Sequence, residues 1–345
     1  MKSQTSKRKK DHIELCLTDD VKFNYRTNGF ENYEFEHFAP TEVRIEKIDL
    51  STNFFKKKIS YPFLISCMTG GTGEAAKINE KLAIAARHLN IPIGVGSQRQ
   101  SLENSNHLNS FKVIRKNAGN VPVIGNLGAA QVAKSKNIVE NVQYLSDLIE
   151  ADAFVIHLNP LQELIQPEGQ TDFKGLIKAV ERLAAKLKIP LIAKEVGSGI
   201  SVAASRILLE AGVKGIDVAG AGGTSWAAVE LIRSKKEDQY FREWGLPTSY
   251  CLRTVNQLRK KYRFMLISSG GINMPEEIAK SLLLGADIAA SARKILQVVN
   301  SYGESGVIDL VNEWFNVVKK IMYLTGSPDI KSFKKKNLIR KSELY

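Results

Sequence analysis

The sequence predicts an α/β protein, a closed (β/α)8 TIM barrel with an N-terminal extension. Eight short apolar runs alternate with helical segments from residue 61 onward, as expected of strands buried on both faces of a parallel sheet. Polar or glycine-rich residues follow every run, at the edge where a barrel carries its site. Eight such units in roughly 240 residues match the size of this fold, and an open, doubly wound sheet is the alternative.

The predicted elements follow one another in a regular order. Strands are expected at residues 61–66, 91–95, 121–126, 153–158, 190–194, 215–219, 264–268 and 287–291. Helices are expected at residues 74–89, 106–117, 138–150, 172–187, 201–211 and 275–284, with a further helical region at the C-terminus. Residues 226–262 form a longer, partly helical excursion, for which we expect the role of a lid or a subunit contact.

The alternation of apolar runs and helical segments is weak in the residues before and after the predicted barrel. We assign residues 1–60 to an N-terminal extension, residues 61–325 to the barrel and residues 326–345 to a C-terminal tail. Within the extension, residues 1–10 are expected to form a mobile basic tail, residues 11–17 to begin a helix, and residues 30–38 to be irregular.

Composition narrows the classes of function. The net charge is +13 over 345 residues, but Lys and Arg are spread along the chain without the binding module of a nucleic-acid-binding protein. We therefore expect a small anionic ligand and no nucleic acid. Cys16, Cys67 and Cys251 are too few for a disulfide framework or a zinc cluster, which favours a reducing cytoplasm. No apolar stretch approaches the ~18 residues of a membrane span, so we expect no membrane partner.

The fourth predicted strand leads into the most polar cluster of the chain. His157, Asn159, Gln162 and Glu163 bring together an imidazole, two amides and a carboxylate, which an apolar core would tolerate only if they were paired. His157 alone would more often be a core residue. Glu163 is the one plausible hard-metal ligand, and a single carboxylate suits Mg²⁺, which keeps waters and shares phosphate oxygens of its substrate.

The last two predicted strands end in a phosphate-binding pattern. Gly270 to Asn273 precede Pro275, and glycines there let backbone N–H groups approach a phosphate at the start of a helix. Lys194 also ends an apolar strand. It could form a structural ion pair, form a Schiff base, or place a positive charge beside an electron-rich cofactor ring. Arg99 suits a phosphate or carboxylate, or a surface ion pair.

Together these motifs resemble the type 2, flavin-dependent isopentenyl-diphosphate isomerases over nearly the whole chain. The matching segments are Arg8-Lys9 with residues 12–14, and residues 68–71, 96–99, 157–163, 194–197 and 220–226. The resemblance implies a barrel enzyme of isoprenoid biosynthesis that uses FMN and Mg²⁺ to interconvert isopentenyl and dimethylallyl diphosphate. NAD(P)H would keep the flavin reduced, and the reduced flavin would act as the acid and base.

The resemblance also implies roles for individual residues. The catalytic group would be Gln162, His157 and Lys194. The substrate would be held by Arg8, Lys9, Ser97, Gln98, Arg99, Asn159 and Gln162. The flavin would be lined by Ser66, Cys67, Met68, Thr69, Ser97, Asn126, Lys194 and Thr224, with its phosphate on Gly271, Ile272, Asn273, Ala292 and Arg293. Mg²⁺ would bind Glu163. The substrate would be a small-molecule diphosphate, and the enzyme would be a homo-oligomer, a tetramer or an octamer.

Other functions compete with this interpretation. An FMN-dependent barrel oxidoreductase acting on a small anionic substrate would use the same phosphate site and Lys194, but it has no evident use for Gln162, Glu163 and the Arg8-Lys9 pair. A Schiff-base aldolase would use Lys194 covalently. A basic scaffold for RNA or an acidic partner is the non-enzyme alternative. The chain differs from the family pattern at Asn273, where Arg is frequent, and at Ala219, where Ser is frequent.

Overall fold

The computed structural model, which describes residues 4–18, 20–105, 108–235 and 240–344, is a closed barrel of eight parallel strands. The strands follow the chain order around the barrel, and β11 pairs with β4 to close it. They are β4 (Phe63–Ile65), β5 (Ile93–Gly94), β6 (Val123–Gly128), β7 (Ala153–Leu158), β8 (Leu191–Glu195), β9 (Gly215–Asp217), β10 (Met265–Ser268) and β11 (Ile288–Ser291). The predicted fold class is therefore confirmed, and the open sheet is excluded.

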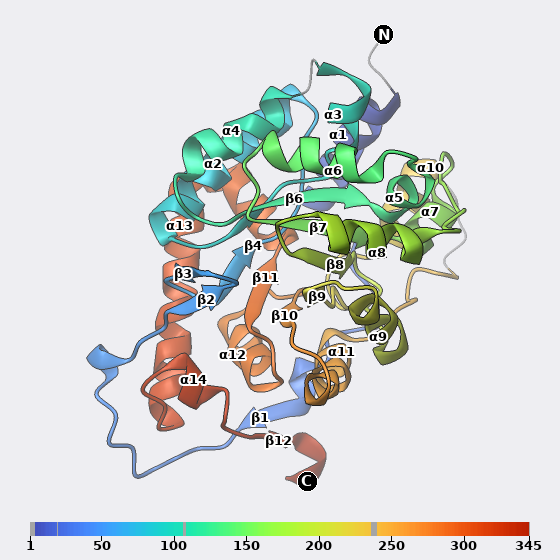
Figure 1. Ribbon diagram of the computed structural model, residues 1–345. Coiled ribbons are helices and arrows are strands. Elements are labelled where there is room, and N and C mark those ends of the chain that lie inside the picture. Colours follow the sequence, from blue (N-terminus) through green and yellow to red (C-terminus); the bar gives the residue numbers. More distant parts are fainter. Residues whose placement is uncertain (1–3, 19, 106–107, 236–239, 345) are drawn as a thin grey trace.

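Helices surround the barrel (Figure 1). The long helices are α2 (Gly73–Leu89), α4 (Asn109–Ala118), α6 (Ile138–Asp147), α8 (Leu176–Lys186), α9 (Val202–Glu210), α10 (Trp226–Ser234), α11 (Thr248–Val255), α12 (Pro275–Leu283) and α13 (Arg293–Leu324). The short helices α3 (Arg99–Glu103), α5 (Ala129–Lys134), α7 (Pro160–Ile165) and α14 (Ile330–Phe333) were not anticipated. Each has six residues or fewer, which is too short for a 3.6-residue period to be visible.

An apolar layer fills the barrel interior below the carboxyl ends of the strands. Leu64, Ile124, Val155, Ile192 and Ile267 belong to this cluster. Phe54 and Ile59 join it from the hairpin of β2 (Thr52–Phe54) and β3 (Lys57–Ile59). The extension therefore contributes to the same core as the strands, and the barrel is a packed interior rather than a pore.

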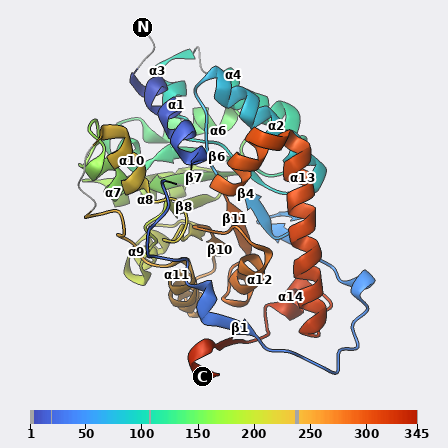
Figure 2. The same ribbon diagram turned by 180° about the vertical axis from the view of Figure 1, so that it is seen from behind.

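The extension begins with a helix. Residues 4–10 belong to α1 (Gln4–Leu17), so the expected mobile tail is corrected for them, whereas residues 1–3 lie outside the described part of the chain. Helix α1 packs against α10 and α13, and Figure 2 shows it lying near α10. This tertiary contact stabilises a segment whose own helical pattern is weak.

The remainder of the extension pairs with the C-terminal tail. Within the segment expected to be irregular, β1 (Tyr33–Phe35) forms an antiparallel pair with β12 (Leu338–Arg340), which corrects that expectation. The partner strand lies at the far end of the sequence, so no local pattern could reveal it. None of the helices described here has both the length and the apolar character needed to cross a membrane.

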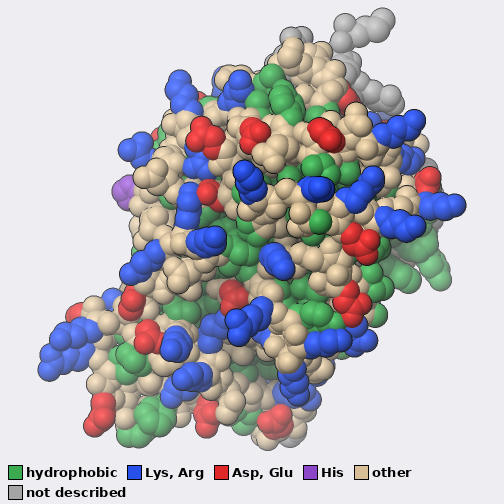
Figure 3. Space-filling view, in the orientation of Figure 1, with side chains coloured by type: hydrophobic (Ala, Val, Ile, Leu, Met, Phe, Trp, Pro, Cys, Tyr) green, Lys and Arg blue, Asp and Glu red, His purple; other side chains and the backbone are tan. Residues whose placement is uncertain are grey.

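The basic side chains are spread over the face of the molecule that Figure 3 shows. On the face shown in Figure 3, Lys and Arg side chains lie scattered among Asp and Glu rather than gathered in one continuous patch. The positive charges that matter most for the site lie elsewhere, inside the cavity at the carboxyl ends of the strands.

Candidate active site

A polar layer lies directly above the apolar layer of the barrel. Side chains alternate along a strand, so the residues two positions beyond the apolar ones, and beyond Gly215 on β9, also point inward. They are Ser66, Asn126, His157, Lys194, Asp217 and Ser269. All of them except Asp217 line a cavity at this end of the barrel.

The cavity brings together nearly all of the site residues expected from the sequence. Those that line it are Arg8, Lys9, Ser66, Cys67, Met68, Thr69, Ser97, Arg99, Asn126, His157, Asn159, Gln162, Glu163, Lys194, Thr224, Gly271, Ile272, Asn273, Ala292 and Arg293. Gln98 is the exception. It is fully buried, donates to the carbonyl of Leu145 and accepts from the N–H of Asn126. Gln98 therefore supports β6 from behind the cavity wall, and its expected contact with the substrate stays a prediction.

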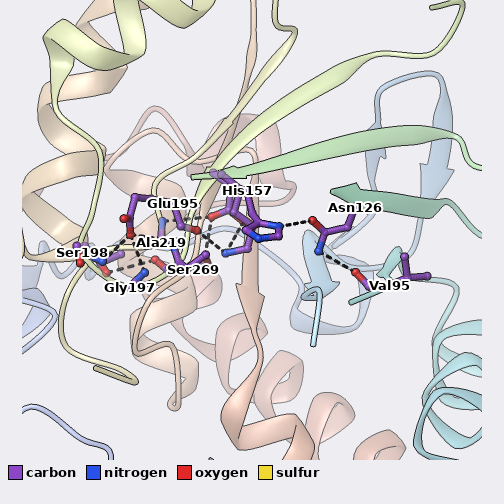
Figure 4. A network of polar contacts seen from close by, with 12 residues as sticks. Val95, Asn126, His157, Glu195, Gly197, Ser198, Ala219 and Ser269 are labelled. Atoms are coloured by element: carbon purple, nitrogen blue, oxygen red, sulfur yellow. Dashed lines mark hydrogen bonds and ion pairs between the residues drawn. The ribbon is translucent and has the colours of Figure 1, made fainter. Parts of the chain in front are cut away.

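Lys194 combines two of the alternatives left open by the sequence. Its Nζ lies 3.5 Å from Asp217 Oδ2 and donates to the carbonyl of Glu195 at 2.9 Å. It also lines the cavity. The ion pair is therefore present, and the same ammonium group remains available to a ligand. Figure 4 labels Glu195, Ala219 and Ser269 of the surrounding network of polar contacts.

His157 is held as a neutral imidazole with a defined tautomer. Its Nδ1 lies 2.8 Å from Asn126 Oδ1, and Asn126 Nδ2 donates to the carbonyl of Val95 (Figure 4). Burial, followed by the nearby charges of Lys194, Lys9 and Arg8, lowers the pKa of His157 to about 4. Because Asn126 presents an acceptor, Nδ1 carries the proton and Nε2 of the neutral ring is left as an acceptor.

Helix α1 brings two half-buried cations, Arg8 and Lys9, into the cavity. Lys9 Nζ donates to the carbonyls of Gly70 at 2.6 Å and Ser97 at 3.0 Å. Burial, and then the charge of Arg8, lowers the pKa of Lys9 to about 7. Arg99 lies close enough to Arg8 to lower the Arg8 pKa as well, after burial. Arg99 also forms the ion pair expected as its alternative role, with Nε 2.7 Å from Glu103 Oε1. Three cations against this one carboxylate form a site for an anion, because an anion reduces their mutual repulsion.

The start of α7 presents the polar cluster predicted after the fourth strand. Asn159 precedes Pro160, a favoured first helical residue. Its Nδ2 donates to Gln162 Oε1 at 3.2 Å and to Glu163 Oε1 at 3.1 Å. Asn159 Oδ1 is buried without a hydrogen-bond partner. A buried polar atom of this kind at a cavity wall is suited to a ligand donor or a bound water.

Sequence reasoning missed a buried carboxylate that connects three elements. Glu230 on α10 has no exposed side-chain surface. It accepts from Gln162 Nε2 at 3.2 Å, pairs with His12 Nε2 at 2.8 Å and accepts from Arg233 Nε at 2.7 Å. The one available signal was the spacing of Arg8 and His12, which places both on one face of a helix. Their meeting with α10 could not be inferred.

Two glycine loops, residues 220–223 and residues 270–271, form the wall where the phosphate was expected. Gly270 and Gly271 have φ of 102° and 77°, which glycine adopts readily. A Cβ on Gly271 would lie 2.5 Å from the carbonyl oxygen of Gly222, so this close approach requires glycine. The Asn273 N–H donates to Glu277 Oε2 at 2.6 Å, which leaves Gly271 and Ile272 as the better placed backbone donors.

Comparison with known proteins identifies the family. Residues 157–340 match the FMN-dependent dehydrogenase family. An isopentenyl-diphosphate delta-isomerase of Pelodictyon phaeoclathratiforme is 44% identical over 98% of both chains. Its counterpart in Nostoc sp. is 42% identical over 96% of this chain and 95% of its own. The chain belongs to the isopentenyl-diphosphate delta-isomerase family. This confirms the resemblance seen in the sequence motifs.

Solved structures support the fold of this family member. A flavocytochrome b2 variant superimposes with a TM-score of 0.72 at 18% identity, covering 95% of this chain and 82% of the other. A mandelate oxidase variant gives a TM-score of 0.66 at 15% identity, covering 94% and 93%. At these identities the likeness concerns the barrel alone.

The cavity of this family member fits FMN, the cofactor that its family membership supports. A flavin needs phosphate donors at one end and a polar wall at the other. In the described part of the chain, the N–H groups of Gly271 and Ile272 donate to no protein acceptor, and the N-terminus of α13 begins beside them at Ala292 and Arg293. Unpaired N–H groups at a helix start suit a phosphate, and Lys194 and Asn126 supply the polar wall.

Proposed function

We propose that the chain interconverts isopentenyl diphosphate and dimethylallyl diphosphate with the help of reduced FMN, in isoprenoid biosynthesis. One observation carries the proposal: a single cavity joins the flavin-type wall around Lys194 to the cation group of Arg8, Lys9 and Arg99. Gln162 of α7, hydrogen-bonded to Glu230 of α10, lines the same cavity. A barrel oxidoreductase would use the first part and has no evident need of the others. The activity named for the relatives at 44% identity supports the same conclusion.

The reaction moves a double bond, which requires that one carbon gain a proton and another lose one. Reduced FMN, when bound, supplies the proton donor and acceptor and an electron-rich ring that stabilises positive charge. Gln162 orients the alkene, and Glu230 fixes the Gln162 amide by accepting from its Nε2. Arg8, Lys9 and Arg99 hold the diphosphate, so that binding energy remote from the alkene positions it. We assign His157, through its acceptor Nε2, and Lys194 to the catalytic group together with Gln162.

We propose that Mg²⁺ binds at Glu163 together with oxygens of the diphosphate. Glu163 lines the cavity, and its oxygens accept from Asn159 Nδ2 and from the N–H of Gln170. Among the residues described, no cluster of three or more acidic, His or Cys side chains could hold a metal alone. One carboxylate plus substrate oxygens and waters suits Mg²⁺, which supports a type 2, Mg²⁺-dependent enzyme.

We further propose that NAD(P)H is the reductant, that the enzyme is a homo-oligomeric tetramer or octamer, and that it acts in the cytoplasm. All three cysteines are unpaired, which agrees with a reducing compartment. Light scattering of the purified protein tests the oligomeric state.

The test of the activity is anaerobic. The protein is loaded with FMN, reduced with dithionite, and given Mg²⁺ and isopentenyl diphosphate while product and flavin absorbance are followed together. We expect dimethylallyl diphosphate to form while the flavin stays reduced, and EDTA to abolish turnover. Stoichiometric FMN binding without conversion would reject the isomerase and favour the oxidoreductase.

A further inference from the structure

Asp217 is the one acidic residue among the six that form the polar layer, and it does not line the cavity. It ends β9 in register with Lys194 on the neighbouring strand β8. It is 1% exposed. A carboxylate buried this deeply needs a cation and hydrogen-bond donors to compensate for its lost hydration. The side chains around it supply both.

The contacts of Asp217 hold the side chains of Lys194 and Ser269 and the backbone of Ala219 in place. Asp217 Oδ2 lies 3.5 Å from Lys194 Nζ, and Oδ1 accepts from Ser269 Oγ at 2.5 Å. Oδ1 also accepts from the N–H of Ala219 at 3.3 Å. Ala219 has a φ of 36° and lines the cavity, a conformation that is unfavourable for a residue with a Cβ. Asp217 therefore holds both Lys194 and a strained turn at the cavity wall.

The other titratable groups around Lys194 contribute less charge. Burial lowers the pKa of His157 to about 4 and raises that of the Cys67 thiol to about 12, so both are neutral near pH 7. Glu195 Oε2 accepts from the backbone N–H groups of Val196, Gly197 and Ser198, and burial raises the pKa of Glu195 to about 7, so its charge near Lys194 is only partial at neutral pH. Lys9 and Arg8 lie at the anion end. Asp217 is thus the group that meets the Lys194 charge directly.

We propose that Asp217 is a positioning residue that holds Lys194 at the cavity wall, offsets part of its positive charge, and so sets the reduction potential of bound FMN. The inference rests on the FMN binding included in the proposed function. Two-electron reduction of FMN with uptake of one proton adds one negative charge to the ring. A cation beside it favours the reduced form, and a buried carboxylate behind that cation opposes this effect.

The test compares holoprotein variants without any isoprenoid substrate. Asp217→Asn removes the negative charge and keeps the shape. The potential of bound FMN is measured anaerobically against a reference dye, and the dissociation constants of oxidised and reduced FMN are measured separately. We expect the preference for reduced over oxidised FMN to increase about tenfold, a rise of about 30 mV for a two-electron couple. An unchanged potential would overturn the proposal.

A matched control separates this effect from the loss of any buried ion pair. Asp287 precedes β11 at the opposite end of the barrel and pairs with Arg259 and Lys334. Asp287→Asn is the same chemical change far from the cavity, so the potential should stay at the wild-type value. A shift of equal size in this variant would show that the Asp217 effect is a general consequence of loosening the barrel.

A second variant serves if Asp217→Asn does not fold. Ser269→Ala removes the O–H that shares the charge of Asp217, so the carboxylate offsets Lys194 more strongly and the potential should fall. A rise or no change would contradict the proposal, as would loss of FMN from both variants. Because no substrate is present, absence of isomerase activity in the wild type would reject the proposed function and leave this measurement intact.

Discussion

Lys9 shows how burial, together with a neighbouring cation, lowers the pKa of a single side chain. Its pKa is lowered to about 7 by burial and by Arg8, so the ammonium group is charged below pH 7 and neutral above. A neutral Lys9 attracts the diphosphate less. We therefore expect kcat/KM, which reports ionisations of the free enzyme, to fall as the pH rises through about 7.

The Lys9→Arg variant tests this assignment. Arginine stays charged throughout this range, so the fall in kcat/KM near neutral pH should disappear, whatever the absolute rate of the variant. A profile of the variant that still falls at the same pH would assign that ionisation to another group.

Glu230 is a second residue whose role depends on burial. It accepts hydrogen bonds from Gln162 and Arg233 and pairs with His12. Glu230→Gln replaces an acceptor by an amide that must direct its NH2 at one of these donors. We expect kcat to fall by about tenfold or more, because Gln162 loses its fixed orientation, while FMN affinity is retained.

Glu168→Gln is the control for this prediction, since Glu168 contacts the same Arg233 from a more exposed position. Equal losses in both variants would contradict the role of Glu230.

At the scale of elements, α1 acts as a wall of the anion site. Arg8 and Lys9 line the cavity, whereas Lys7 and Lys10 on the same helix are exposed. Removing both members of either pair changes the net charge equally. Only the loss of Arg8 and Lys9 should weaken binding of the diphosphate, because salt screens exposed charges strongly and charges inside a cavity much less.

The matching prediction compares two double variants. Arg8→Ala with Lys9→Ala should raise KM for isopentenyl diphosphate by about a hundredfold, since two charged hydrogen-bonding partners are lost, with FMN affinity nearly unchanged. Lys7→Ala with Lys10→Ala should leave KM within about twofold at 0.15 M salt. Similar KM values for the two double variants would mean that α1 acts only through the general positive charge of the protein.

For the whole molecule, FMN should couple the two glycine loops, the N-terminus of α13 and the polar layer into one unit. A ligand that binds only the folded state adds about 2.7 kcal/mol to the free energy of unfolding at 100 times its Kd. We expect calorimetry to show a higher Tm with FMN. Riboflavin, which lacks the phosphate, should raise it much less at the same concentration. An equal rise would show that Gly271 and Ile272 do not hold the phosphate.

Much of this architecture could be predicted from the sequence because its signals are local. Each barrel strand is an apolar run followed by a polar or glycine-rich turn, and the alternation with helices is visible within about 30 residues of chain. The segment from His157 to Glu163 could be placed at a strand end, and therefore at the catalytic edge of a barrel. Most of the expected site residues consequently line the cavity.

Contacts between residues far apart in the chain could be seen only in the tertiary structure. The pairing of β1 with β12, the docking of α1 beside α10, and the meeting of His12 and Gln162 on Glu230 have no periodic signal. Lys194 illustrates the limit. The sequence alone placed it at a strand end, but its partner Asp217 is set by the register of two barrel strands, and strand register is fixed by the packing of the whole barrel.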